Sequence, residues 1–129
     1  MDEVTAAAGY ARSHRDATLR RLITLLRFPT VSAEPRHAAD MSACAAWLAR
    51  LLGRIGLTDV RVCRGQVAPV VTAAWHGSRG GPTVLVYGHY DVQPAGPLPA
   101  WATDPFRPLA WSSTLRDRAD ALAHCIRGG

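Results

Sequence analysis

The chain has 129 residues, enough for one small domain but short for a two-domain enzyme. Hydrophobic residues make up 48% of it, which favours a packed globular core over disorder. The formal net charge is +5, and all 15 basic residues are arginines scattered from Arg12 to Arg127. Because they form no run with interleaved aromatic residues, the composition argues against nucleic-acid binding. No apolar run is long enough to span a membrane.

Two helices are expected in the first half of the chain. Residues 1–12 show no clear hydrophobic period and are expected to be a loose leader. The S-x-x-D pattern that starts at Ser13 is typical of a helix N-terminus, and Pro29 ends the helix. A second helix is predicted from about His37 to Ile55 by a long, regular apolar stripe. Gly56 then stands where a C-terminal glycine belongs.

Strands are expected next. Residues 59–63 alternate with a period of two, and residues 67–75 are a second apolar, β-branched run. Residues 83–87 are continuously apolar, which predicts a strand covered on both faces as in an α/β sheet. A proline-rich loop follows from Pro94 to Pro108, and residues 113–126 are expected to form a helix.

The candidate site is the His89-x-Asp91 pattern where the predicted buried strand ends. Ligands of α/β sheets bind outside the carboxyl ends of strands, and residues two apart in a strand point to the same side. A neutral imidazole is a good zinc ligand, and a nearby carboxylate commonly fixes its tautomer. Taken alone, however, the short pattern favours a capped strand end at which Asp91 begins the next turn.

A longer string changes this interpretation. The sequence from Pro82 to Ala95, which contains Y-G-H-Y-D-V-Q-P, resembles the first metal-binding motif of the zinc exopeptidase family. That family includes aminoacylases, acetylornithine deacetylases, succinyl-diaminopimelate desuccinylases, glutamate carboxypeptidases and carnosine-type dipeptidases. The sequence of this string looks most like that of the dipeptidase branch. Trp101 and the P-F-R-P segment that begins at Pro105 also resemble that branch. With the F-P-T-V-S segment from Phe28, the resemblance covers about residues 15–108.

The resemblance implies a fold, a chemistry and two residue roles. The fold would be α/β: a partial three-layer zinc-exopeptidase-like catalytic domain, truncated, with two N-terminal helices followed by a mixed sheet. His89 would be a ligand to one of two zinc ions, and Asp91 would be the active-site carboxylate that orients it. These two residues alone are not expected to hold the zinc pair tightly. The implied function is that of a metallopeptidase-type hydrolase, cleaving the amide bond of a dipeptide or N-acyl amino acid. Neither a nucleic acid nor a membrane is expected as a partner.

The end of the chain departs from the family pattern. The glycine-rich stretch that precedes the family's metal-bridging aspartate is absent after Pro108. Asp117 and Asp120 lie near the expected distance but in the wrong context, which favours surface charges. Residues 13–108 are therefore interpreted as the N-terminal part of a catalytic domain. Residues 109–129 are interpreted as a divergent tail, for which a frameshift is one explanation.

Two interpretations of function stay open at this stage. One is a hydrolase present only as an incomplete N-terminal part, and the other is an inactive truncated remnant with no catalytic function of its own. The three cysteines form no C-x-x-C motif, and the sequence begins with acidic residues. The acidic residues stand where an export signal would be basic, and the cysteine spacing favours reduced thiols. Together these features favour a cytoplasmic protein. Nothing in the sequence indicates an oligomeric state.

Overall fold

The computed structural model describes residues 2–77 and 80–108, which are divided between two compact units. Unit 1 comprises Met1–Arg27 with Ala95–Gly129, and unit 2 comprises Phe28–Pro94. The helix predicted at residues 113–126 lies outside the described residues. No helix in the described ranges is long and apolar enough to cross a membrane.

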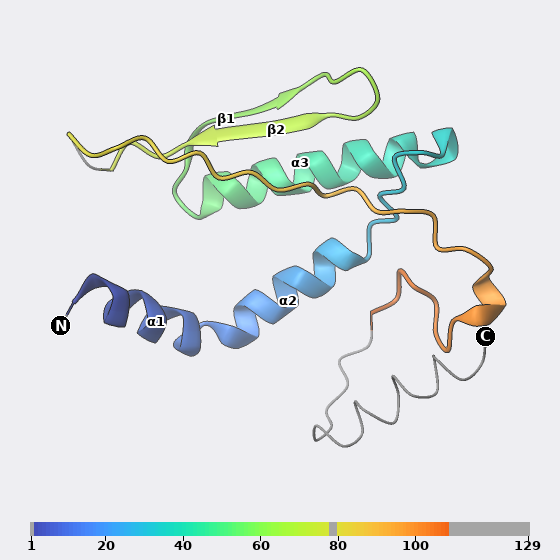
Figure 1. Cartoon of the computed structure of the whole chain (residues 1–129), viewed down its shortest axis with the longest axis horizontal. Helices are drawn as coiled ribbons and strands as arrows, with labels where there is room; N and C mark the ends of the chain where they lie inside the picture. The colour runs from blue at the N-terminus through green and yellow to red at the C-terminus, as the bar shows by residue number, and fades with distance from the viewer. Residues whose placement is uncertain (1, 78–79, 109–129) are drawn as a thin grey trace. The chain divides into compact units, whose positions relative to one another are not determined.

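Unit 1 begins with two helices, α1 (Glu3–Ser13) and α2 (Arg15–Leu26) (Figure 1). The segment expected to be a loose leader, residues 1–12, thus contains most of a helix, which its sequence did not predict. Helix α1 has no apolar stripe, but it is rich in alanine, the strongest helix former. The Asp2 side chain also caps it by accepting a hydrogen bond from the Thr5 backbone N–H at 2.7 Å.

The start of α2 differs from the predicted capping pattern. The Ser13 hydroxyl donates to the Tyr10 carbonyl instead of capping α2, and His14 occupies the N-cap position without a side-chain bond to the helix. Because Ser13 already belongs to α1, its hydroxyl bonds one turn back. The predicted proline-rich loop contains only a short 3-10 helix, η2 (Leu98–Ala100), within its described part.

Unit 2 is built on helix α3 (Ala38–Arg54), which follows a short 3-10 helix, η1 (Pro35–His37). The second predicted helix is thus confirmed to within one residue at each end. Gly56 has a φ of 96°, and its N–H donates to the Gly53 carbonyl at 3.1 Å. The Leu57 N–H donates to the Leu52 carbonyl, completing the C-terminal motif that the glycine predicted.

An antiparallel hairpin of β1 (Thr58–Cys63) and β2 (Val70–Ala74) lies beside α3 (Figure 1). Both strands were predicted, although β2 is shorter than the apolar run that contains it. The buried residues of the described chain cluster where α3 meets the segment before it. They are Thr30, Val31, Met41, Cys44 and Ala45.

The strand predicted at residues 83–87 does not form in the described structure. This segment pairs with no other strand among the described residues, and its apolar side chains are 76–90% exposed from Val84 to Tyr87. The described sheet is the antiparallel hairpin alone, and one isolated parallel bridge between Val31 and Val92 lies outside it. A strand that is buried on both faces needs an element packed against each face. The described part of the chain places no such element against residues 83–87.

Candidate metal-binding site

The predicted site lies where two segments far apart in the sequence run side by side within unit 2. The Val92 N–H donates to the Thr30 carbonyl at 2.9 Å, and the Thr30 hydroxyl donates to the Tyr90 carbonyl at 2.7 Å. Between these bonds, Val31 and Val92 form the parallel bridge. Thr30 and Val31 are only 3% and 2% exposed, so they fix the backbone on which the candidate residues stand.

His89 and Asp91 point toward one another from this backbone. The His89 Nδ1 lies 3.1 Å from the Asp91 Oδ1 and 3.0 Å from the Asp91 carbonyl oxygen. Both partners are acceptors, so the consistent assignment places the proton on Nδ1 and leaves a lone pair on Nε2. The His89 side chain is 73% exposed, which leaves its ring accessible to a ligand.

Asp91 is held from its other side by Ser32. The Ser32 hydroxyl donates to the Asp91 Oδ2 at 2.7 Å. This hydrogen bond is the main reason that the pKa of Asp91 lies below its usual value, and partial burial opposes the shift. The hydrogen bond from His89 lowers the pKa further. The carboxylate is therefore ionised at neutral pH and available as the acceptor for the imidazole.

Tyr90 anchors the site segment to the loop between the two strands. Its hydroxyl donates to the Pro69 carbonyl at 2.5 Å, away from the bonds that join Asp91 to Ser32 and His89. Burial raises the pKa of the Tyr90 phenol, and the negative charges of ionised Cys44 and Asp91 would add to this effect. Tyr90 therefore acts as a neutral donor that fixes the segment between the two candidate residues.

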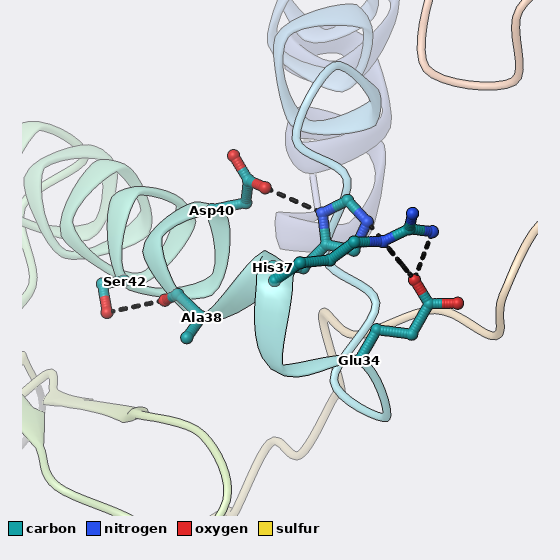
Figure 2. A network of polar contacts seen from close by, with 6 residues as sticks. Glu34, His37, Ala38, Asp40 and Ser42 are labelled. Atoms are coloured by element: carbon teal, nitrogen blue, oxygen red, sulfur yellow. Dashed lines mark hydrogen bonds and ion pairs between the residues drawn. The ribbon is translucent and has the colours of Figure 1, made fainter.

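A second cluster of ionisable side chains surrounds the start of α3, as Figure 2 shows. The His37 Nδ1 lies 2.8 Å from the Asp40 Oδ2, and its Nε2 lies 3.6 Å from the Glu34 Oε2. Arg36 also donates from its Nε to Glu34 at 2.6 Å. Arg36 and Glu34 thus pair opposite charges, and the His37 ring lies between two carboxylates. No group of three or more His, Cys, Asp or Glu side chains among the described residues is arranged to hold a metal.

The structure therefore brings together the two predicted site residues, His89 and Asp91, whose roles stay predictions. Asp117 and Asp120 lie outside the described residues. Sequence reasoning missed Ser32 as a partner of Asp91, although it belongs to the F-P-T-V-S segment that carried part of the resemblance. The family resemblance of both segments was the one signal that could have linked Ser32 to Asp91. Nothing in the sequence next to Ser32 indicates a contact with a residue 59 positions away.

Comparison with known proteins identifies relatives in two enzyme groups, although no family model matches the chain. A succinyl-diaminopimelate desuccinylase of Xylella fastidiosa (strain 9a5c) is 37% identical over 87 residues, covering 67% of this chain and 22% of the relative. A Cys-Gly metallodipeptidase, DUG1, of Candida albicans is 31% identical over 100 residues, covering 68% of this chain and 21% of the relative. The chain thus spans about a fifth of the length of these curated relatives.

A solved structure shows the same likeness in three dimensions. The dipeptidase Dug1p of Saccharomyces cerevisiae superposes with a TM-score of 0.73 at 26% identity, covering 81% of this chain and 24% of that one. The fold therefore matches part of the α/β domain of this dipeptidase. The chain belongs to the exopeptidase family that includes these desuccinylases and metallodipeptidases, which confirms the family predicted from the string around His89.

Proposed function

We propose that this chain supplies a metal ligand and its orienting carboxylate to the zinc centre of a peptidase-type hydrolase. His89 binds the metal through Nε2, and Asp91 holds the proton on Nδ1. The hydrogen bond between the His89 Nδ1 and the Asp91 carboxylate carries the proposal. A metal-bound histidine almost always donates its other ring N–H to a carboxylate, a carbonyl or water, and here it has both a carboxylate and a carbonyl.

The His89 side chain fits the role of a single zinc ligand. A neutral imidazole with its proton on Nδ1 presents a lone pair on Nε2, the form in which histidine binds zinc. When bound, a pair of zinc ions polarises a carbonyl and generates a nucleophilic hydroxide from water. Within this chain, Asp91 accepts a hydrogen bond from the His89 Nδ1–H. This bond fixes the orientation of the ring and makes His89 a better ligand.

The proposed substrate class is a dipeptide or an N-acyl amino acid. The names of the two relative groups, a Cys-Gly metallodipeptidase and a succinyl-diaminopimelate desuccinylase, support this class. The free thiols of Cys44 and Cys63 support a reducing compartment, and we propose the cytoplasm.

Zinc titration of the whole chain tests the ligand assignment. Ring ¹⁵N NMR should show the His89 Nε2 signal moving on zinc addition, and His89→Ala should weaken binding by at least about tenfold. His76→Ala is the matched control, because that side chain is also 73% exposed and lies 3.3 Å from a carboxylate, that of Asp59. Unchanged zinc affinity in the His89→Ala protein would overturn the proposal.

Catalysis requires a separate assay of the same proteins. Dipeptides, including Cys-Gly, and N-succinyl amino acids would be incubated with the zinc-loaded chain. Turnover that disappears in His89→Ala and persists in His76→Ala supports a hydrolase that uses His89. Zinc binding at His89 without turnover supports the alternative, a chain with no catalytic function of its own.

A further inference from the structure

We infer that Ser32 is a positioning residue for His89, acting through Asp91. The inference rests on the proposed function and extends the site to a segment on which that function makes no claim. The Ser32 hydroxyl donates to the Asp91 Oδ2 at 2.7 Å, while the Asp91 Oδ1 faces the His89 Nδ1 at 3.1 Å. One carboxylate thus joins the serine and the histidine, with a different oxygen for each.

This division of the carboxylate oxygens limits the rotation of Asp91. An aspartate with one partner can turn about its side-chain bonds and present either oxygen, or neither, to the imidazole. Ser32 occupies Oδ2 and so leaves Oδ1 directed at the ring. His89 is 73% exposed, so little surrounding packing constrains its ring, and its orientation depends on hydrogen bonds.

Ser32 can perform this role because its own backbone is held on both sides. Before it, Val31 is buried and bridges to Val92, which immediately follows Asp91. After it, the Glu34 N–H donates to the Val31 carbonyl at 3.2 Å, closing a turn that leads into α3. The hydroxyl is thus presented from a fixed backbone.

The polar cluster at the start of α3 secures the far end of this turn. The His37 N–H donates to the Glu34 carbonyl at 2.9 Å, and the His37 ring lies between the Glu34 and Asp40 carboxylates (Figure 2). Removing the Ser32 hydroxyl therefore leaves the turn intact and deletes only the bond to Asp91. For this reason Ser32→Ala is an interpretable variant.

The test measures the His89 tautomer in the metal-free chain by ring ¹⁵N chemical shifts. In the unsubstituted protein the His89 Nδ1 should carry the proton. In Ser32→Ala the Nδ1-protonated population should fall without vanishing, because the Asp91 carbonyl remains an acceptor at 3.0 Å. Zinc affinity should fall by up to about tenfold. This is the lower end of the usual effect of changing a residue that orients a metal ligand through hydrogen bonds. Ser32→Thr keeps the hydroxyl and should restore both properties.

Ser42→Ala is the matched control, because it removes a serine hydroxyl on α3 that donates to the Ala38 carbonyl at 3.0 Å and not to Asp91. It should leave the His89 tautomer unchanged. Equal tautomer populations in the unsubstituted and Ser32→Ala proteins would overturn the positioning role, even if zinc binds at His89. A tautomer shift in a chain that binds no zinc would retain that role and overturn only the proposed function.

Discussion

Two cysteines of the described chain differ sharply in their surroundings. Cys44 lies on α3 with no exposed surface, whereas Cys63 is exposed at the end of β1. Burial disfavours the charged thiolate and raises the pKa of Cys44 from 9.0 to about 11. Since the thiolate is the reactive form, Cys44 is expected to behave as a small core side chain and not as a nucleophile.

The reactivity of the two thiols can be compared directly. At pH 8 the raised pKa lowers the thiolate fraction of Cys44 about 100-fold relative to an ordinary thiol, and burial adds a steric barrier. Iodoacetamide should therefore label the exposed Cys63 much faster than the buried Cys44, as followed by peptide mass spectrometry. Denaturant should remove the difference. Equal labelling rates in the native protein would contradict the buried position of Cys44.

The pH dependence of stability from Cys44 has a defined sign. Because the folded pKa lies above the unfolded value, the folded state favours the neutral thiol. This contribution to stability is fully present below the ordinary thiol pKa of 9.0, and it is lost as the pH rises toward about 11. Cys44→Ala should reduce the alkaline loss of stability measured by thermal melting from pH 8 to 11, although it lowers stability at neutral pH.

Among the secondary-structure elements, α1 depends most visibly on a single cap. The Asp2 carboxylate accepts the Thr5 N–H, and this hydrogen bond is the main reason that the pKa of Asp2 is lowered. A lowered pKa means that the cap is fully effective above the ordinary aspartate pKa and is lost as the pH falls through the folded value. Helix α1 contains no buried residue, so packing compensates little for that loss.

Substitution of the cap should therefore change the pH response of α1. On acidification from pH 6 to 2, the Cα chemical shifts of residues 3–6 should lose helical character in the unsubstituted protein. Asp2→Asn can still cap but carries no titrating group, so its shifts should change much less over this range. Glu3 is common to both proteins and controls for other carboxylates. Identical pH profiles would show that Asp2 does not cap α1.

The elements also show where sequence reasoning succeeds. Helix α3 was predicted to within one residue because its apolar stripe and its terminal Gly56 are local signals. Helix α1 was missed because its signals are alanine content and the Asp2 cap, with no apolar period. Residues 83–87 were assigned to a strand wrongly, because pairing depends on neighbours that no local pattern specifies.

The candidate site divides in the same way. The proximity of His89 and Asp91 followed from their spacing and from the longer string around them, and the structure brings the two side chains together. Ser32 lies 59 positions before Asp91, and a contact of that range is created by the backbone bridge between Val31 and Val92. A single sequence carries no direct record of such a pairing.

At the scale of the whole molecule, the segment Thr83–Tyr87 is the most exposed apolar stretch of the described chain. Its side chains from Val84 to Tyr87 are 76–90% exposed, and its backbone forms no strand pairing within the described residues. A short, uncharged, β-branched segment with free backbone groups readily pairs with another chain. We therefore expect this segment to dominate concentration-dependent self-association of the protein.

Leu85→Arg tests this expectation, because Leu85 is 90% exposed at the centre of the segment. Removing one leucine from an apolar contact costs at least about 1.5 kcal/mol, which weakens association about tenfold. Val67→Arg adds the same charge at a side chain that is 81% exposed outside the segment, so it separates local contact from general repulsion. Sedimentation velocity over a concentration series should show reduced association for Leu85→Arg only. Equal reduction in both variants would mean that net charge, and not Thr83–Tyr87, governs the association.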